Sequence, residues 1–166
     1  HPGPGAGRPP RRCRDPLTRT GWHHAPVEPR EPDPGAPECF VSVDVETSGP
    51  SPSVASLLAV GACLVDDPSV GLYLELRPDP DRGWDDEAAA IHGLDRERLE
   101  REGLTPADAM TRLVAWLGEV AADARPVFVG LNAAFDWMFV ADALWRTVGR
   151  NPLGIAPLDL KALYMG

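Results

Sequence analysis

Residues 40–49 constrain the fold of this chain more than any other stretch of it. Three valines alternate there with polar residues, which is the period-two pattern of a β-strand with one apolar face. The same alternation places Asp44 and Glu46 together on the other face, roughly 7 Å apart. Two neighbouring anions on a core strand repel each other unless a cation lies between them, and hard divalent cations prefer carboxylate oxygens as ligands. The stretch therefore predicts a metal-dependent site on the first strand of an α/β domain.

The charge of the chain is divided unevenly along its length. Residues 1–37 hold six arginines against four acidic residues, a net +2, whereas residues 38–166 hold ten Lys or Arg against twenty-one acidic residues, a net −11. Such an acidic domain is poorly suited to non-specific binding of duplex nucleic acid, which depends on Lys and Arg contacts to phosphates. It can still act on a strand end if metal ions supply the positive charge.

The composition changes at the same boundary. Residues 1–37 contain ten of the nineteen prolines and almost no aliphatic residues, so they cannot bury enough apolar surface to offset their chain entropy. We therefore expect a disordered Pro/Gly/Arg-rich tail over residues 1–37. Residues 38–166 are long enough for a single folded domain.

Cys13, Cys39 and Cys63 are odd in number and lack the spacing of a zinc site or a disulfide framework. Reduced thiols in a cytoplasmic protein are the favoured interpretation. No apolar run reaches the roughly 18 residues that a membrane span needs, and the N-terminus lacks the apolar core of a secretory signal. We expect a cytoplasmic protein with no membrane partner.

The remaining pattern predicts an antiparallel three-strand meander, followed by helices and a parallel strand. Apolar and alternating runs at residues 57–65 and 70–76 follow the first strand through short turns. Thr105 followed by proline marks a helix start, and apolar residues at helical spacing continue to residue 121. A continuous apolar run then indicates a buried parallel strand. The elements expected after residue 76 are helices at 85–91, 95–102 and 105–121, a strand at 126–131, a helix at 132–148, a strand or turn near 155–158 and a helix from 159.

A third carboxylate, Asp136, lies in the first turn of the helix that Asn132 is expected to cap. This helix is apolar on most sides, which predicts burial on more than one face. Its N-terminus favours the anionic form of Asp136, and a turn that follows a parallel strand can come close to the first strand. Three acids on rigid elements suit two magnesium or manganese ions about 4 Å apart.

Three segments of the chain resemble motifs of a known family. Residues 43–49 (VDVETSG) resemble the first motif of the DEDD 3′–5′ exonucleases, and residues 132–136 (NAAFD) resemble the second. Residues 90–94 (AIHGL) are similar to the Ile-His-Gly-Ile element of the DEDDh branch, which includes the polymerase III proofreading subunit, ribonuclease T and oligoribonuclease. The resemblance covers residues 40–166. It implies a ribonuclease H-like fold, in which the meander is extended by parallel strands and flanked by helices.

The resemblance also implies a function and assigns roles to matching residues. The enzyme would hydrolyse terminal phosphodiester bonds at single-stranded 3′ ends of DNA or RNA by a two-metal mechanism. Asp44 would bridge two Mg²⁺ or Mn²⁺ ions, Glu46 would hold the ion on the nucleophile side, and Asp136 would serve the second ion. The substrate residues implied are Thr47 for the terminal nucleotide, Phe135 for packing near the terminal bases and Asn132 for orienting the loop.

The family's third motif, a general-base histidine followed by a fourth carboxylate, has no match in the chain. His92 matches the middle element instead and is predicted to be a turn or core histidine. Asp159 opens a segment that resembles the element preceding the missing motif. We therefore expect a C-terminally truncated domain with little nuclease activity of its own.

A function of a different class stays open at this point. The chain could be a catalytically incomplete exonuclease-like module that binds nucleic-acid ends or a protein partner. The sequence chooses neither DNA nor RNA as the substrate, and it leaves a homodimer open as the oligomeric state.

Overall fold

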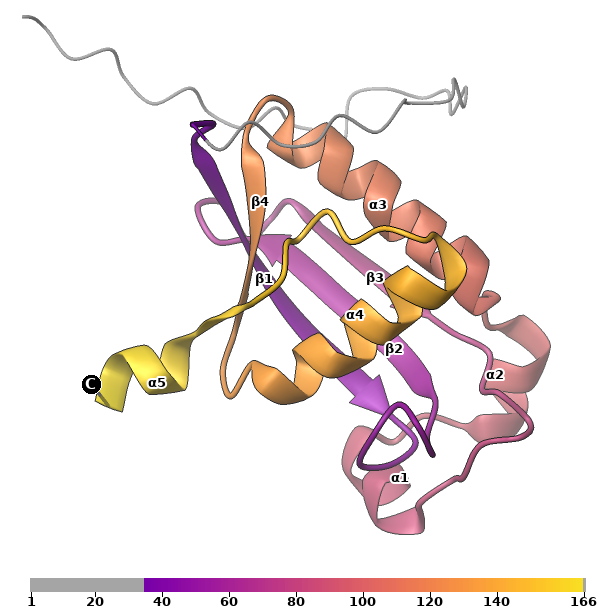
Figure 1. Cartoon of the computed structure of the whole chain (residues 1–166). Helices are drawn as coiled ribbons and strands as arrows, with labels where there is room; N and C mark the ends of the chain where they lie inside the picture. Colours follow the sequence, from indigo (N-terminus) through magenta and orange to yellow (C-terminus); the bar gives the residue numbers. More distant parts are fainter. Residues whose placement is uncertain (1–34, 166) are drawn as a thin grey trace, which may run out of the picture.

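The computed structural model describes residues 35–165 (Figure 1). The tail predicted over residues 1–37 therefore lies almost entirely outside the described residues. The elements in chain order are β1 (Glu38–Thr47), β2 (Leu57–Leu64), β3 (Gly71–Glu75), α1 (Asp86–His92), α2 (Arg96–Glu102), α3 (Pro106–Ala121), β4 (Arg125–Gly130), α4 (Ala134–Thr147), β5 (Leu158–Asp159) and α5 (Leu160–Met165). Each element expected from the sequence is present, with its ends within a few residues of the prediction.

The strands form one sheet in the order β3-β2-β1-β4-β5. β1 pairs antiparallel with β2, and β2 pairs antiparallel with β3, which confirms the predicted meander. β4 and β5 extend the sheet as parallel strands. The pairing of β1 with β4 ends at Ser42, opposite Val129. Beyond Ser42, β1 therefore has a strand partner only on its β2 side.

Helices α3 and α4 pack against each other and against one face of the sheet (Figure 1). The valines of β1 point into the core between these layers and are buried. The core includes Val41, Val43, Val45, Leu113, Leu117, Phe128, Phe139 and Leu144. The period of two along β1 consequently sends Ser42, Asp44 and Glu46 to the opposite face of the sheet, as predicted.

The first three helices begin at side chains that cap them. Thr105 Oγ1 accepts a hydrogen bond from the backbone N–H of Asp108 at 3.1 Å, and Pro106 takes the first position of α3. Asp85 and Asp95 cap α1 and α2 in the same manner. The predicted start of α3 is confirmed.

The start of α4 differs from the prediction. Asn132 does not cap this helix, because the N-cap is Ala133, which makes no side-chain cap hydrogen bond. Asn132 instead adopts a left-handed backbone with a φ of 60°, a conformation that asparagine tolerates better than most residues. Its backbone N–H donates to Asp159 Oδ1 at 3.1 Å. A residue far downstream fixes this turn, so a pattern of neighbouring residues could not reveal it.

The burial of α4 is also less complete than predicted. Phe139, Val140, Ala143 and Leu144 are buried, whereas Trp145 is 59% exposed. The prediction of burial on several faces is therefore wrong for Trp145. Within the described residues, α3 and the sheet cover only one side of this apolar helix.

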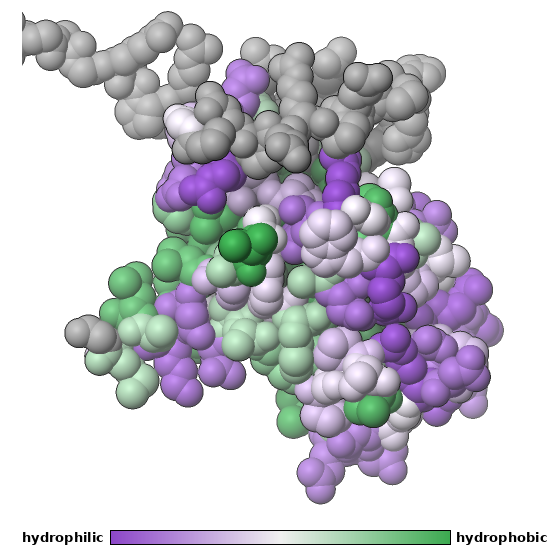
Figure 2. All heavy atoms as spheres, viewed as in Figure 1, coloured by the Kyte–Doolittle hydropathy of each residue, from purple (hydrophilic) through white to green (hydrophobic). Residues whose placement is uncertain are grey.

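Apolar side chains also gather around α5, which stands away from the body of the domain (Figures 1 and 2). Leu163, Tyr164 and Met165 on this short helix are exposed.

Residues 35–165 contain no helix that is both long enough and apolar enough to cross a membrane. Cys39 is buried and Cys63 is half-buried, whereas Cys13 lies outside the described residues.

Candidate active site

Two of the three predicted carboxylates lie on β1, on the sheet face opposite α3 and α4. Asp44 is exposed and Glu46 is half-buried. Their neighbours on β2 are small, with Gly61 opposite Asp44 and Ala59 opposite Glu46. No large side chain of these two β2 positions therefore fills the space beside the carboxylates.

The third carboxylate, Asp136, reaches β1 from the first turn of α4. Its Oδ1 accepts a hydrogen bond from the backbone N–H of Val45 at 3.0 Å, and the residue is only 7% exposed. Val45 lies beyond the last residue pair between β1 and β4. Asp136 thus satisfies a backbone donor that a neighbouring strand would otherwise satisfy. The bond holds Asp136 against the backbone of Val45, the residue that lies between Asp44 and Glu46 in β1.

The three carboxylates influence one another electrostatically. Burial raises the pKa of Glu46, and the negative charge of Asp44 raises it further. Burial also raises the pKa of Asp136, the N–H of Val45 lowers it, and the charges of Asp44 and Glu46 raise it again. Asp44 thus contributes to both shifts.

The chemistry of this cluster fits a hard divalent cation. All three side chains offer only oxygen donors, which Mg²⁺ and Mn²⁺ prefer, and a cation would offset the repulsion that raises the pKa values. Within the part of the chain that the structure describes, no three His, Cys, Asp or Glu side chains are already spaced as a metal-binding group. Like charges stay apart when no cation lies between them. Asp136 is anchored by its hydrogen bond, whereas the exposed Asp44 can rotate.

The three residues predicted to contact substrate lie at the ends of the same two elements. Thr47 ends β1, is buried, and donates from Oγ1 to the carbonyl oxygen of Gly49 at 2.9 Å. Asn132 is exposed in the turn before α4. Phe135 is half-buried in the first turn of α4, and its ring is tilted against Phe139 with the centroids 5.3 Å apart.

A network of hydrogen bonds that the sequence did not reveal ties the loop after β1 to the segment before α1. Ser48 Oγ donates to the carbonyl oxygen of Gly83 at 2.7 Å and accepts the backbone N–H of Ser56 at 2.8 Å. The backbone N–H of Asp85 donates to the carbonyl oxygen of Ser48 at 2.9 Å. Ser48 and Ser56 are both buried. These bonds fix the start of α1, and with it the motif at residues 90–94, relative to the carboxylates of β1.

His92 is the last residue of α1 and is half-buried. Its Nδ1 accepts the backbone N–H of Leu94 at 2.9 Å, and its ring packs edge-on against Trp84 with the centroids 5.8 Å apart. The sequence predicted a turn or core histidine, and the structure places His92 at the C-terminal end of α1, directly before the Gly93 cap. The sequence did not reveal that His92 lies near enough to Glu46 for its charge to lower the pKa of that carboxyl.

Comparison with curated proteins identifies the family. The chain is 44% identical over 130 residues to the 3′–5′ DNA exonuclease Cap18 of Escherichia coli, in a match that covers 78% of this chain and 69% of that protein. The chain belongs to the DEDD family of 3′–5′ exonucleases. Members of this family are hydrolases of terminal phosphodiester bonds, so the predicted family and enzyme class are confirmed. No family model matches the chain.

Solved structures show that this chain shares its fold with exonuclease I. A metal-free complex of E. coli exonuclease I with single-stranded DNA matches with a TM-score of 0.61 and 18% identity, over 76% of this chain and 29% of that one. Exonuclease I of Methylocaldum szegediense matches with a TM-score of 0.62 and 20% identity, over 76% and 28%. The ribonuclease H-like fold is thereby confirmed. The chain spans less than a third of these exonuclease I chains.

Proposed function

We propose that this chain forms the metal-binding part of an exonuclease that removes nucleotides from the 3′ end of single-stranded DNA. The observation that supports the proposal is the hydrogen bond from the Val45 N–H to the buried Asp136, because Val45 lies between Asp44 and Glu46 in β1. The choice of DNA as the substrate rests on two similar proteins. The relative Cap18 is called a DNA exonuclease, and exonuclease I was solved with single-stranded DNA and with a dT13 oligonucleotide.

Each carboxylate has a separate role in the proposed site. A pair of divalent cations, when bound, supplies an activated water and a counter-charge for the departing 3′-oxygen. Asp44 would bridge the pair, Glu46 would hold the cation on the nucleophile side, and Asp136 would serve the second cation. Asp136 keeps its orientation through Val45, so its ligand oxygen does not have to be ordered at the moment of binding.

We propose Mg²⁺ or Mn²⁺ as these cations. The donor set contains only carboxylate oxygens, which are hard ligands without the nitrogen or sulfur that zinc favours. A structure of E. coli exonuclease I with DNA holds a zinc ion, so that protein binds a divalent metal. Zinc is therefore the competitor to include in a binding assay.

The substrate residues keep their predicted roles in this proposal. Thr47 already uses its hydroxyl proton on Gly49, so Oγ1 would meet the terminal nucleotide as a hydrogen-bond acceptor. Phe135 would pack near the terminal bases. Asn132 would orient the loop before α4, and its bond to Asp159 supports this.

Thermal melts and strand degradation together test the proposal. Mg²⁺ or Mn²⁺ should raise the melting temperature of the wild-type chain and of Asp66→Asn, a control at an exposed turn, but not of Asp44→Asn. A longer form of the protein that carries a downstream histidine and aspartate should release mononucleotides from a 3′-labelled DNA strand faster than from a matched RNA strand. A wild-type chain that gains no stability from either metal would contradict the site. Binding without hydrolysis by the longer form would favour the catalytically incomplete module instead.

The role of the tail, the cellular location and the oligomeric state are three further proposals. We propose that residues 38–166 fold without residues 1–37, so a trimmed chain should keep its melting temperature. A cytoplasmic location stays a prediction that fractionation of the source cells can check. The homodimer that the resemblance leaves open can be checked by sedimentation velocity.

A further inference from the structure

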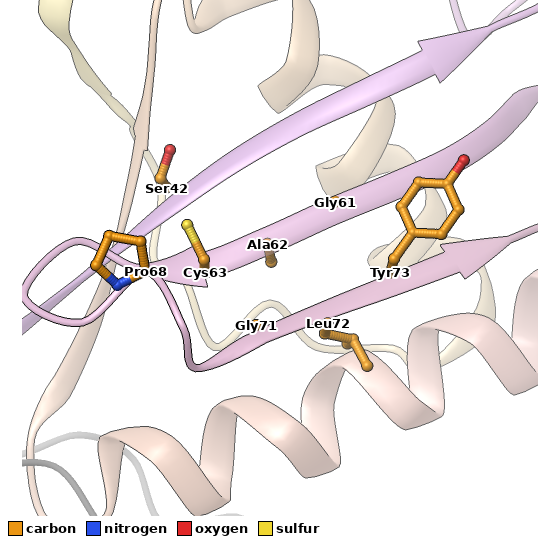
Figure 3. A pocket seen from close by; sticks show the side chains of 8 residues that line it. All are labelled: Ser42, Gly61, Ala62, Cys63, Pro68, Gly71, Leu72 and Tyr73. Atoms are coloured by element: carbon orange, nitrogen blue, oxygen red, sulfur yellow. The ribbon is translucent and has the colours of Figure 1, made fainter. Parts of the chain in front are cut away.

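A shallow groove crosses the sheet face that carries the carboxylates, on the side of β2 and β3 (Figure 3). Its volume is about 500 Å³. Two of its lining residues, Gly61 of β2 and Gly71 of β3, have no side chains. Tyr73 stands up from β3 at one end of the groove, on the same side as Ser42 (Figure 3).

The strand register connects this groove to the candidate active site. Gly61 is the partner of Asp44 on one side and of Tyr73 on the other, so the three residues form one row across the sheet. Adjacent strands are about 4.8 Å apart, which places the backbone of Tyr73 about 10 Å from that of Asp44. An added Cβ at Gly61 would contact the Tyr73 ring at 3.9 Å. The groove therefore shares Gly61 with the row that contains Asp44, although Asp44 itself does not line it.

Tyr73 is exposed, yet its position is held by neighbours. The ring is 60% exposed, and its hydroxyl donates to Glu75 Oε1 at 3.4 Å. Glu75 is in turn bound by Arg98 of α2 through two hydrogen bonds, one of them 2.9 Å long. The Arg98 guanidinium lowers the pKa of Glu75, so this carboxylate stays ionised and keeps accepting the bond. An exposed aromatic ring with such support is suited to contact a ligand.

The charges around the groove determine whether it would bind the phosphates or the bases of a nucleic acid. Its lining contains no Lys or Arg among the described residues, and Arg98 nearby is paired with Glu75. A phosphate would find no counter-charge there, whereas the flat, neutral face of a base can stack on a tyrosine ring. Burial and the charge of Glu75 raise the pKa of Tyr73, so the phenol stays neutral.

From this geometry we infer that Tyr73 is a stacking platform for one nucleobase of the single strand whose 3′ end lies at Asp44. The inference rests on the proposed function and adds a base subsite to it. A stacked base supplies sequence-tolerant affinity, and it fixes how far the strand advances before hydrolysis. The nucleotide whose base stacks on Tyr73 lies close to the 3′ end, because Tyr73 is only two strands away from Asp44.

Binding of a short 5′-labelled oligothymidylate, measured by fluorescence anisotropy with Ca²⁺ present, tests the inference. Tyr73→Ala should weaken binding about tenfold, whereas Tyr73→Phe should bind nearly as the wild type because it keeps the ring. Trp145→Ala is the matched control, since Trp145 is equally exposed but lies on α4, on the other side of the sheet. Oligonucleotides with one abasic site at the last, second-last or third-last position then locate the base. At one position, removal of the base should abolish the effect of Tyr73→Ala.

Each other outcome overturns the inference. If Tyr73→Ala binds as tightly as Trp145→Ala, the ring contacts no base, and the carboxylate site is unaffected by that result. If Tyr73→Ala weakens every abasic oligonucleotide equally and also lowers the melting temperature, then protein rather than DNA packs on the ring. If the wild-type chain binds no single-stranded DNA while Asp44→Asn still loses the metal effect, the inference fails but the metal site stands. If the wild type binds neither DNA nor metal, both the Tyr73 inference and the proposed function fail.

Discussion

The proposed cation site requires Asp136 to stay charged, although burial and the charges of Asp44 and Glu46 raise its pKa. The hydrogen bond from the Val45 N–H opposes part of the resulting rise in its pKa. The same bond closes an open position on the edge of β1. A single side chain therefore serves both the sheet and the site, and substitutions can separate the two roles.

Asp136→Asn should remove the metal effect and leave the metal-free fold intact. The amide oxygen can still accept the Val45 N–H, while the loss of charge relieves the repulsion from Asp44 and Glu46. Asp136→Ala should instead lower the free energy of unfolding by about 1–3 kcal/mol, because the buried N–H then loses its acceptor. Urea unfolding of both variants, with and without Mn²⁺, measures this. Equal losses of stability in the metal-free state would argue against the bond.

The raised pKa values predict a pH dependence with a definite sign. A carboxyl whose pKa is raised by folding binds its proton more tightly in the folded state, so its favourable contribution is full below the ordinary pKa and is lost as pH rises through the folded value. At pH 7 without metal, ionised Glu46 and Asp136 therefore reduce stability. The double variant Glu46→Gln, Asp136→Asn should melt above the wild type at neutral pH, and this advantage should shrink toward about pH 4. An advantage that is constant over this range would mean that the charges do not cause it.

At the scale of elements, two buried serines tie the loop after β1 to the segment before α1. Ser48 bonds to Gly83 and Ser56 through its side chain, and Ser56 Oγ accepts the backbone N–H of Asp79 at 2.9 Å. The position of α1 relative to β1 depends on these bonds, and so does the distance between His92 and Glu46.

Ser48→Ala should destabilise the domain by about 1–3 kcal/mol, because the buried N–H of Ser56 and the part-buried carbonyl oxygen of Gly83 each lose a partner. Ser53→Ala in the same loop is the control, since Ser53 is exposed and its bonds to Ser51 lie at the surface. It should change stability by less than about 0.5 kcal/mol. Guanidinium unfolding curves of the two variants provide the measurement, and equal midpoints would show that the serine network is dispensable.

The sequence predicted elements well where local rules determine them. The alternation of β1 and the Thr105 cap depend on residues a few positions apart, and both predictions are confirmed. The turn at Asn132 depends on Asp159, and the exposure of Trp145 depends on which neighbours cover α4. The motifs likewise indicated which carboxylates to expect. The bond that joins Asp136 to Val45 spans 91 residues, so only the tertiary structure could show it.

At the scale of the whole molecule, the helices α3 and α4 cover one face of the sheet, while Asp44 and Tyr73 on the other face are exposed. The chain also spans only 69% of its relative Cap18. In the proposed site the carboxylates of β1 and α4 hold cations, but the 166 residues contain no match to the family's downstream histidine.

The 166-residue chain should therefore bind metal and yet hydrolyse DNA slowly. A general base contributes roughly 10²–10⁴-fold to such a reaction, and a longer form with a downstream histidine and aspartate should recover a factor of that order. Release of mononucleotides from a 3′-labelled strand at saturating Mn²⁺ compares the two forms. Comparable rates would mean that the catalytic set is complete within the domain described here.

The bond between Val45 and Asp136 also gives the site a built-in reporter. Exchange of the Val45 amide hydrogen with solvent deuterium requires this bond to open, which moves the first turn of α4 away from β1. A cation held by Asp136 and β1 together would oppose that opening, so exchange at Val45 should slow as the metal concentration rises past its dissociation constant. Amides in the helix–sheet core, such as that of Leu117, should change only with global stability. If Val45 exchanges no more slowly when metal raises the melting temperature, the cation binds elsewhere. If it does slow, one backbone proton can report occupancy of the site without any turnover of DNA.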